Sequence, residues 1–95
     1  MRDDRFEWDD RKARSNAAKH GVTFAEARKV FGDPYAVDDI DDDPGELRDV
    51  AIGRSGDEIL FVCWTGRNGR VRIISARKAD RDEQDCYYRQ ASAGE

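Results

Sequence analysis

The side chains with the clearest capacity for chemistry lie in two short segments that are far apart in the chain. One segment carries Arg72, Arg77 and Lys78, and the donor fork of an arginine matches two phosphate oxygens at once. The other segment ends at His20, the only histidine, whose imidazole can take up or release a proton near neutral pH. Metal-free cleavage of RNA needs such groups, because its 2′-OH attacks the adjacent phosphorus. That reaction requires a base, an acid for the leaving 5′-oxygen and positive charge beside the phosphoryl oxygens.

These requirements divide the candidate residues into two predicted sets. The predicted catalytic set consists of Arg72, Arg77, Lys78 and His20. The predicted substrate-binding set consists of Arg67, Arg70, Lys12 and Lys19. Glu83 and Tyr87, near the C-terminus, are alternative proton carriers for the same reaction.

Each assignment has a structural alternative. The five cations of residues 59–79 could form a solvated sheet face with ordinary ion pairs. His20 could satisfy free carbonyl groups at the C-terminus of a helix, Glu83 could be a first-turn helix acid, and Tyr87 could be a packing residue. The absence of acids from residues 59–79 stands against the first alternative, because a strand that needed only solubility would more often mix both signs.

The alternation of side chains along a strand limits how these cations can meet. It places Arg72 and Arg77 on opposite faces of the sheet unless a bulge or a twist intervenes. Arg67 and Arg70 lie at the tip of a predicted hairpin, and Lys78 lies just beyond the end of its return strand. The nuclease hypothesis depends on this hairpin bringing several positive charges to a common place.

Length and composition predict one small domain over residues 1–95. The chain is 38% hydrophobic and 40% charged, with a net charge of −4. The charge is segregated, since residues 38–58 hold nine acidic and two basic side chains, whereas residues 59–79 hold five basic ones. A local basic face can therefore bind phosphate although the total is negative. No apolar stretch reaches the roughly 18 residues of a membrane span, and the N-terminus is acidic, so we expect a cytoplasmic protein with no membrane partner.

Metal and disulfide sites have no support in the sequence. Cys63 and Cys86 lack CxxC spacing and lie in segments of different pattern, so we expect two free thiols. With one histidine and no cluster of carboxylates at ligand spacing, we expect no metal and no cofactor.

Capping residues predict two helices after a short strand-like opening. Asp9 or Asp10 can cap a first helix that ends before Gly21, a residue suited to the left-handed conformation of a helix end. Thr23 and Glu26 have the spacing of a capping box and begin a second helix. Its apolar residues recur on one face and predict contact with the core: Phe24, Ala27, Val30 and Phe31.

The remainder of the chain predicts a meander of three antiparallel strands and a closing helix. The acidic segment 38–46 is typical of a solvated loop. Residues 59–64 are an unbroken apolar run, typical of a central strand, and residues 71–77 return after an Asn-Gly hairpin signal. Asp80 and Glu83 mark the start of the last helix. The order β-α-α-β-β-β-α predicts an α+β fold, with helices packed on a small antiparallel sheet.

Several of these segments resemble the BrnT family of toxins. The likeness is carried by Phe6-Glu7-Trp8-Asp9, by Lys19-His20-Gly21-Val22 and by Arg72-Ile73-Ile74-Ser75-Ala76-Arg77-Lys78-Ala79, and it extends from about Phe6 to Tyr88. One departure lies in the last helix, where a Glu-Arg pair is usual and this chain has Glu83-Gln84. The departure removes one cation from the start of that helix.

The resemblance implies a fold similar to RelE-type toxins and a ribonuclease that acts as the toxin of a bacterial type II toxin–antitoxin system. It also implies a cognate BrnA-like antitoxin of the ribbon-helix-helix class, in a two-plus-two assembly. Operator DNA would be contacted through that antitoxin, and RNA would be the substrate. Among the site residues, the resemblance carries over Arg72, Arg77, Lys78 and His20.

Two other functions remain open. The chain could be a non-catalytic regulatory module of the same kind of operon that binds nucleic acid or protein through the basic strand. It could also be self-inhibited, with the acidic 38–49 segment masking the basic face. The chain is not expected to be the antitoxin, because a ribbon-helix-helix protein needs one short strand followed by two helices.

Overall fold

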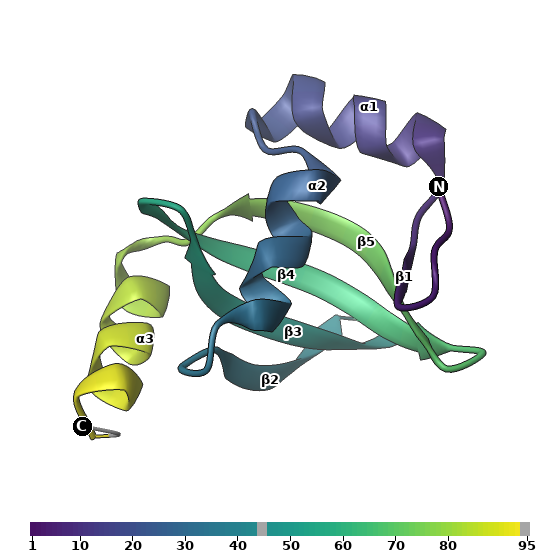
Figure 1. The fold of residues 1–95 in the computed structure, drawn as a ribbon. Helices are drawn as coiled ribbons and strands as arrows, with labels where there is room; N and C mark the ends of the chain where they lie inside the picture. The colour runs from purple at the N-terminus through teal and green to yellow at the C-terminus, as the bar shows by residue number, and fades with distance from the viewer. Residues whose placement is uncertain (44–45, 94–95) are drawn as a thin grey trace.

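The computed structural model describes residues 1–43 and 46–93 (Figure 1). In chain order, its elements are β1 (Phe6–Glu7), α1 (Asp10–His20), α2 (Phe24–Ala27), the 3₁₀ helix η1 (Arg28–Gly32), β2 (Val37–Asp43), β3 (Glu46–Ser55), β4 (Glu58–Arg67), β5 (Arg70–Lys78) and α3 (Arg81–Ala93). None of the helices within the described ranges is long and apolar enough to cross a membrane.

The strands form a five-stranded sheet in the order β1-β5-β4-β3-β2. Strands β2 to β5 are an antiparallel meander, and β1 pairs in parallel with β5. The predicted α+β class is confirmed, although β1 makes the sheet mixed rather than purely antiparallel. The predicted Asn-Gly hairpin is also present, since Asn68 and Gly69 both have a positive φ, of 52° and 76°.

The expectation that residues 38–46 form a solvated loop is wrong for most of the segment. Val37–Asp43 is strand β2, and its pairing with β3 runs through seven residue pairs. The next two residues, Pro44 and Gly45, lie outside the described residues. Aspartate is disfavoured in strands, so the composition indicates a loop. The segment is tolerated as a strand because β2 lies at the edge of the sheet, where side chains such as that of Asp39 reach solvent.

The predicted capping residues begin and end the first two helices. Asp9 caps α1 by accepting hydrogen bonds from two backbone amides at 2.8 and 3.1 Å, and Gly21 ends it with a φ of 70°. Thr23 and Glu26 form the predicted capping box of α2. The second helix is α-helical only to Ala27, however, and it continues as the 3₁₀ helix η1.

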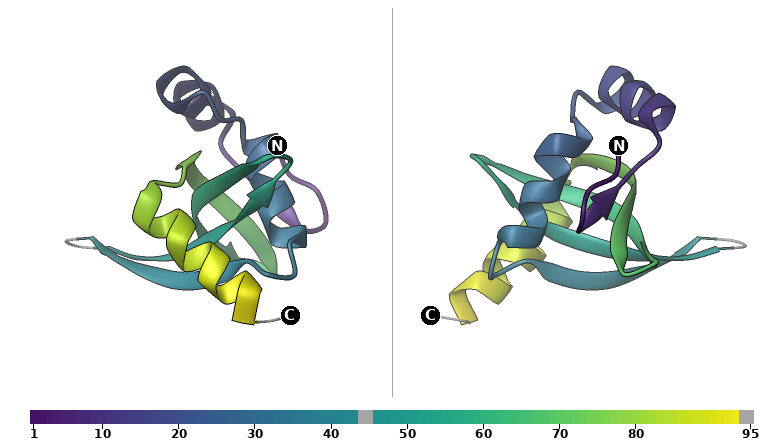
Figure 2. Two further views of the ribbon diagram at one scale, coloured as in Figure 1. Left: turned by 90° about the vertical axis from the view of Figure 1, so that its left-hand side faces the viewer. Right: turned by 45° about the vertical axis from the view of Figure 1, so that its right-hand side comes forward.

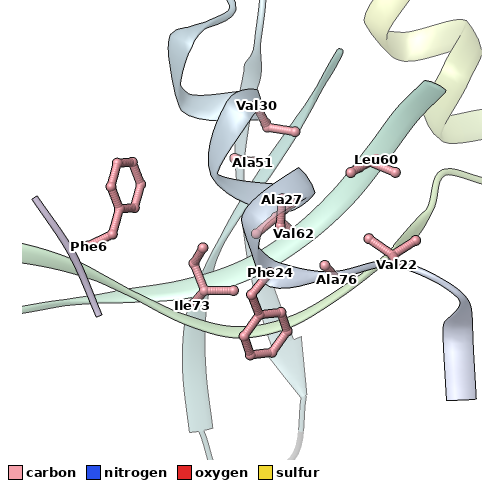
Figure 3. Packing of buried hydrophobic residues seen from close by; sticks show 10 residues of the cluster. All are labelled: Phe6, Val22, Phe24, Ala27, Val30, Ala51, Leu60, Val62, Ile73 and Ala76. Atoms are coloured by element: carbon pink, nitrogen blue, oxygen red, sulfur yellow. The ribbon is translucent and has the colours of Figure 1, made fainter. Parts of the chain in front are cut away.

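One face of the sheet is covered by α2 and η1. Phe24, Ala27 and Val30 are at most 1% exposed, as expected from their helical spacing. Figure 3 shows them among the strand residues of the same core cluster, namely Ala51, Leu60, Val62, Ile73 and Ala76. This layer forms the larger part of the hydrophobic core.

Helix α3 covers part of the opposite face of the sheet (Figure 2). Its Tyr87 is 2% exposed and belongs to a second core cluster, together with Ile59 and Cys63 of β4. Leu60 and Val62, also in β4, belong to the first cluster. The unbroken apolar run of β4 is therefore explained by burial on both faces, as the sequence predicts for a central strand.

Asp33 joins the end of η1 to both β3 and α3. Its Oδ2 accepts hydrogen bonds from Tyr87 Oη at 2.7 Å and from the Arg54 amide at 2.8 Å. Partial burial raises the pKa of Asp33, but these hydrogen bonds outweigh burial and hold its pKa below the usual range. The close approach of η1 to β3 requires a glycine at position 53, because a Cβ there would lie 2.9 Å from a methyl group of Val30.

Candidate active site between helix α1 and strand β5

A β-bulge in β5 determines which of its side chains share a face. The register against β4 shifts at Ile74, which has no partner of its own. The alternation of side chains restarts there, so Arg72 and Arg77 both point to the face opposite α2 and η1. The position of Arg77 supports this, because it stacks 4.1 Å from the ring centre of Phe61, which packs against the cluster on the α3 side. The bulge thus supplies the condition under which the two arginines can act together.

An open hollow lies between α1 and the bulged part of β5. Its volume is about 210 Å³, and β5 contributes Ile74 and Ser75 to its lining. Helix α1 contributes five residues at helical spacing on one face, Lys12, Ser15, Asn16, Lys19 and His20. Figure 1 shows α1 standing off from the sheet on the side of β5. We call this region the α1–β5 hollow.

The α1–β5 hollow brings together three of the eight predicted site residues, Lys12, Lys19 and His20. Both lysines are exposed, and His20 is partly buried. Among the described residues, neither lysine forms an ion pair with a carboxylate. The hollow therefore combines two ammonium groups that are in no ion pair among the described residues with an imidazole, and such a set suits an anionic ligand.

Arg72 lies next to the hollow on the same face of β5. Its Nη1 is 2.6 Å from Oε2 of Glu7, which is directly opposite it in the parallel pair of β1 and β5. Glu7 is buried, with its side chain 11% exposed, whereas the side chain of Arg72 is 27% exposed. Hydrogen bonds from the amides of Lys12 and Arg11 lower the pKa of Asp9 at the start of α1, and the charge of Arg72 contributes to the same shift. Arg72 is therefore close to the N-terminal end of α1, with its side chain partly open to solvent.

Arg77 forms two hydrogen bonds with its partner acid, whereas Arg72 forms one with Glu7. Its two terminal nitrogens bind both carboxylate oxygens of Glu83, at 2.7 and 2.9 Å. These hydrogen bonds raise the pKa of Arg77 above its ordinary high value. Glu83 also accepts the Asp80 amide at 2.8 Å, and Asp80 caps the amide of Glu83 at 2.9 Å. The pair consequently ties the start of α3 to the end of β5.

The other predicted cations lie outside the hollow. Lys78 is opposite Leu60 in the register of β4 and β5, and its Nζ lies 3.6 Å from Glu58. Arg67 is exposed at the hairpin tip, and Nε of Arg70 donates to the backbone oxygen of Asp3 at 2.7 Å. The hairpin therefore brings Arg72 and Arg77 to one face but does not gather all its cations, because Lys78 is opposite Leu60 of the other core cluster and Arg70 contacts Asp3.

The two alternative proton carriers are engaged in the docking of α3. Glu83 binds Arg77, and the hydroxyl of Tyr87 donates to Asp33. Burial and this hydrogen bond raise the pKa of Tyr87. Both residues are thus placed as structural groups, as their structural alternatives predict.

The acidic segment does not mask the basic strand in the described part of the molecule. Strand β2 lies at one edge of the sheet, and β3 and β4 separate it from β5. The acids that pair with Arg72, Arg77 and Lys78 come instead from β1, α3 and β4. Self-inhibition by residues 38–49 is therefore not supported by this arrangement.

Sequence reasoning missed two residues of this region. Glu7 and Asn16 are not among the predicted site residues, and both are polar side chains that are only 8% exposed. A polar residue between two aromatic residues, in the pattern Phe6-Glu7-Trp8, is a signal that could have indicated a paired buried acid.

Within residues 1–43 and 46–93, no three His, Cys, Asp or Glu side chains form a group that could hold a metal ion.

Comparison with protein families adds the decisive observation. The family model described as "Ribonuclease toxin, BrnT, of type II toxin-antitoxin system" matches residues 8–83, which is most of the chain. The chain belongs to the BrnT family. A search of curated proteins found no match to it. The BrnT match includes α1, the bulged strand β5 and Glu83, so it covers every residue of the α1–β5 hollow.

Membership of the BrnT family identifies a ribonuclease toxin of the type II toxin–antitoxin class, and such a toxin implies a cognate antitoxin partner. The matched region ends at Glu83, within the first turn of α3. The remainder of α3, including Tyr87, lies beyond the match.

Proposed function

We propose that this chain is a metal-independent endoribonuclease and that the α1–β5 hollow is its active site. The observation that carries the proposal is the convergence of Lys12, Lys19 and His20 on one hollow, without carboxylate partners for the lysines among the described residues. The family supplies the substrate class, because it is described as a family of ribonuclease toxins.

In the proposed reaction, His20 takes the proton from the 2′-OH as its oxygen attacks the adjacent phosphorus. The bond from the 2′-oxygen to phosphorus forms and the bond to the 5′-oxygen breaks, which leaves a 2′,3′-cyclic phosphate and a 5′-hydroxyl. The departing oxygen takes a proton from solvent, to which the open hollow gives access. Neither proton transfer requires a metal ion.

The positions of the predicted cations suggest different roles for them in binding the RNA and in the reaction. Lys12 and Lys19 are seven residues apart on α1, about 10 Å along the helix axis, so they would hold different phosphates. Lys19 is adjacent to His20 and would stabilise the charge on the reacting phosphoryl group. Arg72, beside the hollow and on the same face as Ser75, is proposed to assist. The remaining predicted cations would contact flanking phosphates, and these are Arg67, Arg70, Arg77 and Lys78.

Incubation of the purified chain with a single-stranded RNA oligonucleotide in EDTA tests the proposal. We expect cleavage with 2′,3′-cyclic phosphate ends, and no cleavage where a 2′-deoxy nucleotide replaces the reacting one. His20→Ala is expected to lower the rate by about 10²-fold or more. Lys29→Ala is a matched control, because this exposed lysine lies in η1, which covers the other face of the sheet. Cleavage that requires added metal, or an unchanged rate for His20→Ala, would contradict this mechanism.

The regulatory module is the second candidate, because Arg72 and Arg77 are already paired with acids. It predicts that the chain binds the same RNA, with Lys12 and Lys19 required, but leaves it intact in every buffer. We further propose a cytoplasmic location and a BrnA-like ribbon-helix-helix antitoxin in a two-plus-two complex that contacts operator DNA. These three points depend on the family resemblance and are separate from the chemistry of the hollow.

A further inference from the structure

We propose that Asn16 is a positioning residue for the reaction at the α1–β5 hollow, an inference that rests on the function proposed above. Asn16 is the only buried residue of α1, a helix that the structure describes completely. The apolar residues of the same helix are three small alanines, of which Ala13 and Ala17 are partly buried and Ala18 is exposed. Hydrophobic packing therefore contributes little to the attachment of α1 to the sheet. The hydrogen bonds of the Asn16 side chain to β5 are the main contact that fixes the position of the helix.

The carboxamide of Asn16 pairs with the backbone of β5 as a neighbouring strand would. Its Nδ2 donates to the carbonyl oxygen of Ala76 at 2.8 Å, and its Oδ1 accepts from the amide of Ala76 at 3.1 Å. A third hydrogen bond runs from Nδ2 to the carbonyl oxygen of Val22 at 3.0 Å. The two-residue strand β1 pairs only with Val71 and Arg72, so Asn16 satisfies the edge of β5 beyond the end of β1.

The link lies at the centre of the proposed site. Lys12, Lys19 and His20 are at positions i−4, i+3 and i+4 relative to Asn16, on the same helix face. A rotation or shift of α1 would change their distances from Ser75 and from a bound phosphate together. Misplacement of reacting groups by about 1 Å can lower a rate by about 10²-fold. Asn16 is itself buried under the hollow and has all its amide groups engaged, so it acts through the residues it positions.

Two variants separate positioning from simple structural support. Asn16→Ala removes all three hydrogen bonds, and Asn16→Asp keeps the shape and the acceptor but cannot donate to either carbonyl group. Gln84→Ala is the matched control, because the Gln84 amide also donates to a backbone carbonyl, that of Ala79 at 3.0 Å, but lies on α3 away from the hollow. Each variant is compared with the wild type in RNA cleavage, with kcat and KM measured separately, and in amide hydrogen exchange at Ala76.

We expect both Asn16 variants to remain folded and to lower kcat by about 10²-fold, with KM changed by less than about fivefold. Exchange protection at Ala76 should be lost in Asn16→Ala, which has no acceptor for that amide, and largely kept in Asn16→Asp. Combined with His20→Ala, Asn16→Asp should add little further loss, because both changes remove the same aligned imidazole. Gln84→Ala should cleave RNA at the wild-type rate.

The outcomes distinguish this inference from the proposed function. If the wild type and Gln84→Ala cleave RNA and the Asn16 variants retain the wild-type kcat, Asn16 has no positioning role although the nuclease assignment stands. Unchanged protection at Ala76 in Asn16→Ala, or a kcat loss in Asn16→Asp that multiplies fully with that of His20→Ala, would also overturn the inference. A wild type that cleaves no RNA would overturn the proposed function and the inference together.

Discussion

Replacement of Arg72 by methionine is expected to lower both the stability of the fold and the rate of RNA cleavage, for separable reasons. Glu7 would lose its contact at 2.6 Å and become a buried carboxylate without a partner, with its side chain 11% exposed. Removing one member of a fully buried ion pair costs about 3–5 kcal/mol. Because the side chain of Arg72 is 27% exposed and water reaches that end of the pair, we expect a smaller loss of about 2–3 kcal/mol.

The double variant Arg72→Met/Glu7→Gln separates the two effects. It removes the buried negative charge as well, so the free energy of unfolding should return to within about 1 kcal/mol of the wild type. The rate of cleavage should stay about 10²-fold low, because the guanidinium beside the phosphoryl group is still absent. Urea unfolding gives the stability, and initial rates on one RNA substrate in EDTA give the activity. Glu7→Gln alone serves as the control, since it retains the arginine.

The result that would refute this reasoning is a double variant that is stable and cleaves RNA at the wild-type rate. Arg72 would then serve only to neutralise Glu7, and the positive charge at the reacting phosphate would have to come from α1 alone. A double variant as unstable as Arg72→Met would instead show that the contact matters for its packing and not for its charge.

Three further results are expected from the remaining features. Tyr87→Phe, which removes the hydrogen bond to Asp33, should cost about 1 kcal/mol and lower the midpoint of thermal unfolding by about 5 °C. The pKa of folded Asp33 lies below its ordinary value, so its contribution to stability is complete above that value and is lost as the pH falls through the folded pKa. Unfolding measured between about pH 5 and pH 2 should therefore show a steeper loss in the wild type than in Tyr87→Phe. Expression of the chain alone should arrest bacterial growth, and expression with the adjacent open reading frame should restore it; normal growth with a folded product would instead favour the regulatory module.

Local signals in the sequence were sufficient for the elements bounded by capping and turn residues. Asp9, Gly21 and the capping box at Thr23 depend on hydrogen bonds within one helical turn, so a few neighbouring residues specify them. The central strand β4 was equally clear, because burial on both faces requires a continuous apolar run. The acidic strand β2 could not be predicted in this way, since its pairing with β3 overrides the poor strand propensity of aspartate.

The candidate site was predictable in its residue types but not in its geometry. Lys12, Lys19 and His20 could be named as candidates from their chemistry, and their spacing within one predicted helix is that of a single helix face. The bulge at Ile74 did not, because an additional residue in one strand is defined only by its register against another. The burial of Asn16 depends on Ala76, sixty residues away in the chain. Such long-range hydrogen bonds leave no trace in a local pattern, and they are what places the helix beside the strand.

The two edges of the sheet differ in how far their backbone groups are already paired, and this difference affects how the molecule can associate with other copies. Beside β5, the two residues of β1 and the amide of Asn16 pair with backbone groups that would otherwise be open to another strand. Polymerisation by strand addition is left with the border at β2, where Asp38 and Asp39 are exposed and Asp41 is partly so. Two copies meeting there would place aspartates next to aspartates, so electrostatic repulsion disfavours strand addition at the β2 edge. The aspartates that make β2 an unlikely strand by composition therefore also oppose its pairing with a second copy.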